Sequence, residues 1–219
     1  MNRLRIKPRK EVDMRAYREK MERVDIATIG HYTEFGFMDP QIHKIVKGTN
    51  RFFGPALTVR VPAQESKAVH VAVSMAQEGD VLVVDRCGDE SHAAVGEMVA
   101  LCAKTRKLAG IVIDGPLTDI EAITDIGIPV FATGVSALTT KFVADNGEIN
   151  YAISCGGVPV HAGDIIIAEE NGVLVLRDFE IENLLDEAIR DQMEEAEDKC
   201  AVIAGKTLQE LYVPEYPVE

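Results

Sequence analysis

Short runs of consecutive apolar residues alternate along the middle of the chain with stretches in which apolar residues recur at helical spacing. The runs at residues 81–85, 109–115 and 129–134 are short and rich in β-branched residues, as expected of strands buried on both faces. Residues 93–108 and about 119–126 carry the helical pattern between them. This order of elements predicts an α/β protein.

Further elements are predicted towards the N-terminus. Residues 11–29 place apolar side chains at near-helical spacing among charges, which predicts one or two amphipathic helices. Residues 56–61 are typical of a strand. Residues 66–77 predict a short helix capped by the side chain of Ser66.

The C-terminal third adds a hairpin and a long helix. Residues 165–168 and 172–176 flank an Asn171-Gly172 pair, which is a strong hairpin signal. No internal repeat or low-complexity linker appears, so residues 1–219 are expected to form a single domain with helical extensions at 1–29 and 180–205. The apolar stripe of the C-terminal helix consists of Leu184, Leu185, Ala188, Ile189, Met193, Ala196 and Cys200.

Charge and composition exclude several classes of protein. The formal net charge of -13 repels phosphate backbones and anionic lipid, so neither nucleic acid nor membrane is expected as a partner. The basic first 23 residues are interpreted as a solvated arm or a helix on an acidic neighbour. With no secretory signal and no run of about 18 apolar residues, a cytoplasmic location is expected.

The four cysteines are widely scattered. Cys87, Cys102, Cys155 and Cys200 form no CxxC pair, which argues against a disulfide framework and against a thiolate zinc site. They are expected to be mostly small buried hydrophobic residues.

Acidic residues and glycines gather where successive predicted strands end. Asp85 and Asp89 follow one strand, and Asp114, Gly115 and Asp119 follow the next. Ligands of open α/β sheets bind outside these strand ends, and carboxylates are the ligands that Mg²⁺, Mn²⁺ and Ca²⁺ require. The alternative interpretation is that each Asp caps a helix or a turn.

Residues 96–134, GEMVALCAKTRKLAGIVIDGPLTDIEAITDIGIPVFATG, are similar to the metal-dependent 4-hydroxy-4-methyl-2-oxoglutarate aldolases and their RraA-like relatives. This family is often misnamed demethylmenaquinone methyltransferase. The likeness extends through GPALTVRVPA, EGDVLVVD and HAGDIIIAEENGVLVL. It implies a layered α/β sandwich of the RraA-like type, comparable to swivelling phosphohistidine domains, assembled as a homotrimer or as a hexamer of two trimers.

The resemblance also implies a site. The residue that binds the divalent ion, Mg²⁺ or Mn²⁺, corresponds to Asp119, and the acidic residue that holds a metal-bound water corresponds to Glu97. Gly96 begins the helix whose next backbone amides, those of Met98 and Val99, would hold the substrate carboxylate.

The chain departs from the family pattern beside the metal position. Relatives with aldolase activity carry Arg-Asp there, and this chain has Thr118-Asp119, so Thr118 takes the catalytic and substrate-binding place of a guanidinium. Either another cation such as Arg86 reaches the site or the substrate differs. A glutamate from a neighbouring subunit is also implied, with Glu194 or Glu195 as the nearest counterpart.

Two histidines could titrate near neutral pH. His70 lies on the predicted helix at 66–77, and His92 lies between the Gly88 loop and Glu97. His92 is the better candidate for a role in the site because of that position.

The resemblance implies a metal-dependent lyase, an aldolase or decarboxylase acting on a small 2-oxo acid such as 4-hydroxy-4-methyl-2-oxoglutarate or oxaloacetate. Pyruvate would be released through its enolate. One alternative is a protein that binds and regulates ribonuclease E without catalysis, and another is an enzyme for a different acid, because Thr118 replaces the family arginine.

Overall fold

The computed structural model describes residues 4–46, 51–177 and 181–216. Residues 1–3 of the predicted N-terminal extension and Glu180, at the predicted start of the C-terminal helix, lie outside this part of the chain.

The described strands form a central mixed sheet whose middle is parallel. The parallel pairs β3–β4, β4–β5 and β5–β6 follow chain order, and β7 and β2 pair antiparallel at the two sides. This confirms the α/β class. The strand order is β1 (Arg5–Ile6), β7 (Glu148–Ile149), β3 (Phe52–Arg60), β4 (Val81–Asp85), β5 (Gly110–Leu117), β6 (Val130–Val135), β2 (His43–Lys44).

β3 is longer than predicted because it belongs to two layers. Its first half pairs antiparallel with β10 (Ile165–Glu169), and its second half pairs with β4 and β7. β10 and β11 (Gly172–Leu176) form the predicted hairpin, but its two-residue turn is Glu170-Asn171 and not Asn171-Gly172. A separate small hairpin joins β8 (Ile153–Cys155) to β9 (Val158–Val160).

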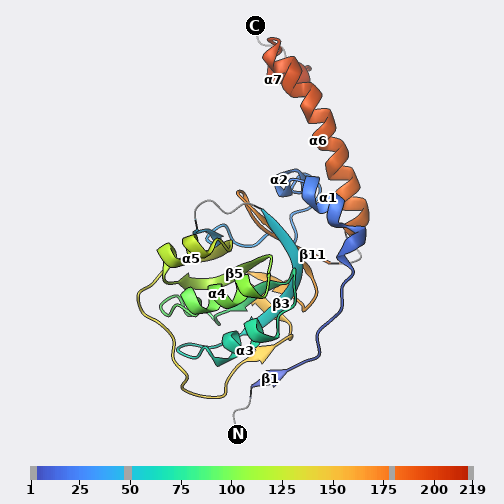
Figure 1. Cartoon of the computed structure of the whole chain (residues 1–219). Helices are drawn as coiled ribbons and strands as arrows, with labels where there is room; N and C mark the ends of the chain where they lie inside the picture. The colour runs from blue at the N-terminus through green and yellow to red at the C-terminus, as the bar shows by residue number, and fades with distance from the viewer. Residues whose placement is uncertain (1–3, 47–50, 178–180, 217–219) are drawn as a thin grey trace.

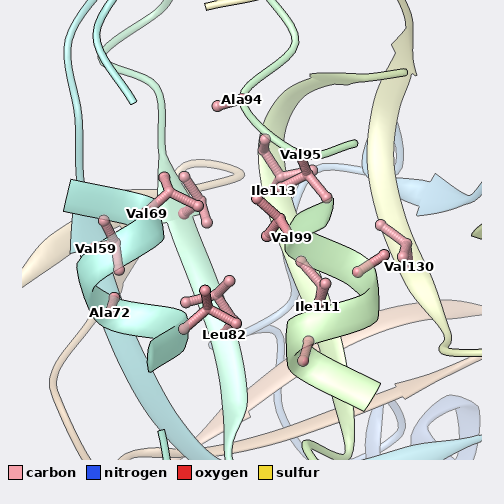
Figure 2. Packing of buried hydrophobic residues seen from close by; sticks show 14 of the residues in the cluster. Val59, Val69, Ala72, Leu82, Ala94, Val95, Val99, Ile111, Ile113 and Val130 are labelled. Carbon is pink, nitrogen blue, oxygen red and sulfur yellow. The ribbon is translucent and has the colours of Figure 1, made fainter. Parts of the chain in front are cut away.

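Three helices, α3 (Lys67–Met75), α4 (Glu97–Thr105) and α5 (Ile120–Ile126), cover one face of the central sheet (Figure 1). Their buried side chains meet those of the strands in one cluster (Figure 2). Each large aliphatic side chain buried there contributes about 1.5–3 kcal/mol. These side chains include Val59, Val69, Leu82, Val99, Ile111 and Ile113.

The hairpin of β10 and β11 carries a second helical layer. It is built from η1 (Met14–Ala16), α1 (Arg18–Arg23), α2 (Ile26–Ile29) and the start of α6 (Ile181–Ile203), with α7 (Leu208–Tyr212) after it. α6 then projects beyond the body of the molecule (Figure 1). None of the described helices combines the length and apolarity needed to cross a lipid bilayer.

The predicted apolar stripe of α6 packs only near its start. Leu185 and Ala188 are fully buried, whereas Met193 is 64% exposed and Cys200 is also exposed. The apolar stripe is therefore exposed along the outer half of the helix.

Two local predictions are corrected in part. Ser66 is the N-cap residue of α3, as predicted, but its side chain makes no capping hydrogen bond, because Glu65 accepts from the N–H groups of Ser66 and Lys67 instead. The helix expected from residue 93 begins at Glu97, because Ala93 and Val95 form β-bridges.

Cysteine burial also differs from the prediction. Cys155 is buried and Cys102 is partly buried, but Cys87 and Cys200 are exposed. All four of these described cysteines carry free thiols.

Candidate active site

Asp119 joins β5 to α5 in a strained backbone conformation. Its φ of 57° and ψ of 42° lie in the left-handed region, which costs a residue other than glycine about 1–3 kcal/mol, although aspartate tolerates it better than most. Its carboxylate does not cap its own helix. Instead Oδ2 accepts from the backbone N–H of Glu97 at 3.0 Å, so the negative charge lies at the N-terminus of α4.

Gly96 allows this approach. A Cβ at this position would lie 2.6 Å from Oδ2 of Asp119 and 2.9 Å from Cγ2 of Thr118. A side chain of any size would therefore push the turn after β5 away from the start of α4.

A pocket of about 340 Å³ lies over this junction. The N–H groups of Met98 and Val99, in the first turn of α4, have no hydrogen-bond partner within the described chain. The residues expected to form the site thus come together. The pocket is lined by Ser66, His70, Ala93, Ala94, Gly96, Glu97, Met98, Val99, Thr118, Asp119, Thr139, Thr140, Lys141 and Phe142.

The other strand-end carboxylates are not in this pocket. Asp85 accepts from Nε of Arg60 at 2.9 Å, and Asp114 accepts from the N–H of Gly156 at 2.8 Å. These groups hold loops in place, which is the alternative interpretation considered for each of them.

The structure favours His70, and not His92, as the histidine of the candidate site. His92 lies with Nδ1 2.8 Å from Asp89 and does not line the pocket. His70 does line it, and its Nδ1 lies 3.0 Å from the carbonyl oxygen of Ser66. A donor at Nδ1 leaves Nε2 as the acceptor nitrogen of the neutral ring.

Arg86 does not supply the charge missing at Thr118. Its side chain is fully buried, and its guanidinium donates to the carbonyl oxygens of Val61, Ala63 and Glu65. Burial lowers its pKa from the ordinary value. The suggestion that Arg86 reaches the pocket is therefore wrong.

Glu194 and Glu195 do not line the pocket of their own chain. Both lie on α6, where Glu195 is 3.4 Å from Nζ of Lys199.

Residues 139–142 form a wall of the pocket that the sequence did not reveal, and Glu65 anchors this segment from behind. The carboxylate of Glu65 accepts from Ser66 and Lys67 at the start of α3 and from Val143 and Ala144 in the segment after β6. Burial alone would raise the pKa of Glu65, but these four N–H groups outweigh it and lower the pKa. A single buried carboxylate thus joins α3 to this wall.

Glu65→Gln should lower the free energy of unfolding by on the order of 2 kcal/mol. The glutamine side chain keeps one acceptor oxygen. Its NH₂ group faces backbone N–H donors from which the second carboxylate oxygen accepts in the wild type. Because the pKa of Glu65 is lowered on folding, the wild type gains stability from it above the ordinary glutamate pKa and loses that gain as the pH falls through the lowered value. Urea titrations at pH 7 and pH 4 measure both effects.

The matched control is Glu78→Gln, which changes an exposed partner of Lys107. It should alter stability by less than about 0.5 kcal/mol. Equal effects of the two substitutions would show that the Glu65 contacts contribute nothing specific.

The residues present suit a hard divalent ion. Among the described residues, Oδ1 of Asp119 accepts a hydrogen bond only from the Thr118 hydroxyl, at 3.3 Å. The exposed carboxylate of Glu97 follows Gly96 in the same pocket. The described residues contain no group of three or more potential His, Cys, Asp or Glu ligands. Mg²⁺ keeps several waters and takes one or two protein carboxylates, so this donor set fits such an ion.

The fold and the pocket define a layered α/β protein whose candidate ligand site pairs a carboxylate with a helix N-terminus. Residues 25–175 match the family described as RraA-like, Aldolase/RraA. The "Putative 4-hydroxy-4-methyl-2-oxoglutarate aldolase" of Halalkalibacterium halodurans is 38% identical over 152 residues, which are 69% of this chain and 72% of that protein. The chain belongs to the RraA-like family.

Two solved structures agree with this assignment. RraAS2 of Streptomyces coelicolor, called an unusual member of the RNase ES inhibitor RraA protein family, matches with a TM-score of 0.77 at 24% identity, over 88% of this chain and 99% of that one. A Geobacillus kaustophilus protein, named S-adenosylmethionine: 2-dimethylmenaquinone methyltransferase, matches with a TM-score of 0.63 at 28% identity, over 69% and 94% of the two chains. The RraA-like fold predicted from the sequence is confirmed.

Proposed function

We propose that this protein is a divalent-metal-dependent carbon–carbon lyase that releases pyruvate from a 2-oxo acid such as 4-hydroxy-4-methyl-2-oxoglutarate or oxaloacetate. The observation that carries the proposal is the left-handed turn at Asp119, which fixes a carboxylate against the N-terminus of α4. Strain of this kind persists where the surrounding structure requires it, and it gathers at functional sites. The name of the Halalkalibacterium relative supports the same reaction class.

The roles of the residues follow from the pocket. Asp119 would hold the Mg²⁺ or Mn²⁺ ion, and Glu97 would position a water that could act as the proton donor. The free N–H groups of Met98 and Val99 bind the substrate carboxylate. Thr118 contacts the oxo end of the substrate as a neutral donor. When bound, the ion supplies Lewis-acid stabilisation of the enolate.

We also propose that the chain is one domain that assembles as a trimer or hexamer. Glu194 or Glu195 on α6 would then reach the site of a neighbouring subunit, because neither lines the pocket of its own chain. The exposed apolar side chain of Met193 in the outer half of α6 suits such a contact.

A second function is favoured by Thr118. Without the arginine of its aldolase relatives, the scaffold could serve as a protein-binding regulator, as the name of the Streptomyces structure says of that family, or could act on a different acid. Retention of Asp119 and Glu97 together in one pocket favours the lyase.

Metal removal tests the proposal. Pyruvate release from 4-hydroxy-4-methyl-2-oxoglutarate and from oxaloacetate is expected with Mg²⁺ or Mn²⁺, is lost after chelation and returns when the ion is restored. Coupled spectrophotometry measures the rate. If the wild type released no pyruvate but Thr118→Arg did, this protein would have lost the pyruvate-releasing reaction. The remaining functions would then be a protein-binding regulator or an enzyme for a different acid.

A further inference from the structure

A second and larger cavity lies in the other helical layer. Its volume is about 510 Å³, and it shares no lining residue with the pocket at Asp119. Its walls come from the loop after α2, from β9, from the end of β11 and from the start of α6. Figure 1 shows α2, β11 and the start of α6 near the place where α6 leaves the body of the molecule. The proposed reaction uses no residue of this cavity.

The loop after α2 is held in place on two sides of the cavity. The carbonyl oxygen of Gly36 accepts from the N–H of Val175 in β11 at 2.8 Å. Gly36 has a φ of 86°, and a Cβ there would lie 2.3 Å from the carbonyl oxygen of Val175. His31, at the start of the loop, lies with Nδ1 3.1 Å from Asp191 of α6. The cavity is therefore preformed, as most sites for small ligands are.

Most of the side chains that line the cavity are apolar. Leu176 is buried, and Val158 and Leu184 are half-buried. The rings of Tyr32 and Phe35 also line the cavity and are exposed. A branched or aromatic side chain of a ligand would therefore leave water for an apolar surface, which is favourable in proportion to the area covered.

Two side chains of opposite charge line the same cavity without pairing with each other. Arg177 follows β11 and is half-buried, and Glu187 lies on α6 and is exposed. Neither side chain makes a hydrogen bond or an ion pair with any residue that the structure describes. By contrast, Oδ1 of Asp186, the neighbour of Glu187, lies 2.7 Å from Nζ of Lys20. Both charges of the cavity are thus available to a ligand.

We infer that this cavity binds an α-amino acid with a large apolar side chain. The ligand carboxylate accepts from the guanidinium of Arg177, its ammonium donates to Glu187, and its side chain covers the apolar lining. A simple anion would face Glu187, and a simple amine would face Arg177. A zwitterion satisfies both groups and adds no charge to a protein of formal net charge -13. The inference does not depend on the lyase reaction.

Calorimetry of the full chain with L-phenylalanine and with L-leucine tests the inference. Arg177→Gln and Glu187→Gln should each weaken binding about tenfold, because each removes one charge-assisted hydrogen bond. Glycine should bind far more weakly than either amino acid, because it leaves the apolar lining uncovered. L-Phenylalanine should also slow amide hydrogen exchange at the start of α6, because the ligand joins that helix to β11.

Ligands with a single charge assign the two ends of the site. 3-Phenylpropanoate lacks the ammonium of phenylalanine, and phenethylamine lacks its carboxylate. Arg177→Gln should weaken binding of the acid and not of the amine, whereas Glu187→Gln should weaken binding of the amine and not of the acid. A change that merely disturbed the fold would weaken binding of both ligands in both variants.

The matched controls are Arg106→Gln and Glu197→Gln, which remove exposed charges outside the cavity. Both controls should bind L-phenylalanine as the wild type does. The inference is overturned if the wild type binds neither amino acid at millimolar concentrations, or if the two cavity variants lose the acid and the amine equally. Pyruvate release without amino acid binding would retain the lyase and remove this site, and the reverse result would retain this site alone.

Discussion

Asp119→Asn should abolish metal-dependent pyruvate release, lowering kcat/KM by at least about a hundredfold. Asparagine tolerates the left-handed conformation of this position, and its amide oxygen can still accept from the N–H of Glu97. The substitution therefore removes the negative charge and little else. Rates with Mn²⁺ and the Mn²⁺ affinity from electron paramagnetic resonance should fall together.

The control for this substitution is Glu121→Gln in the first turn of α5, a residue that does not line the pocket. It should retain wild-type turnover and ion affinity. If Asp119→Asn kept full activity with unchanged Mn²⁺ binding, the ion would have to be held elsewhere and the proposed site would be wrong.

Arg86→Met should lower the free energy of unfolding by about 3–5 kcal/mol. Methionine fills part of the volume of a fully buried arginine, but the carbonyl oxygens of Val61, Ala63 and Glu65 lose their donor, and Asp89 loses a cation 3.3 Å away. Urea unfolding at pH 7 measures the loss. Activity of the remaining folded protein should also fall, because this loop carries Glu65, which anchors the segment that lines the pocket at residues 139–142.

Arg106→Met is the matched control for Arg86→Met. Arg106 is exposed and caps the C-terminal end of α4, and its side chain makes no hydrogen bond or ion pair with the described residues. A loss below about 0.5 kcal/mol is expected there. If Arg86→Met lowered the free energy of unfolding as little as Arg106→Met, water would have to replace the guanidinium as the donor to the three carbonyl oxygens at little cost.

Elements of the fold could be predicted from the sequence where a few consecutive residues define them. Strand β4 was predicted at its observed bounds, because five consecutive apolar or strand-end residues are recognisable without knowledge of their neighbours. β3 was predicted too short, because its first half is stabilised by pairing with β10, more than a hundred residues later in the chain.

The candidate site was less accessible to sequence reasoning. In the sequence, Asp85, Asp114 and Asp119 all lie at or after the ends of predicted strands, and only the resemblance singled out Asp119. Asp119 differs from the other two by its left-handed backbone conformation and by the close approach of Gly96 to its carboxylate. Residue spacing in the sequence predicts neither feature. Glu65 and Lys141 were missed because their association joins segments 76 residues apart, and neither lies in a recognisable motif.

The sharing of β3 by two layers couples those layers to each other. Its first half completes the ladder under the N-terminal helices and α6, and its second half completes the ladder under α3, α4 and α5. Neither layer can open fully without breaking backbone pairs of the same strand, so partial unfolding of one half destabilises the other. The helices of either layer can therefore vary in sequence. The register of β3 must be kept, because both layers depend on it.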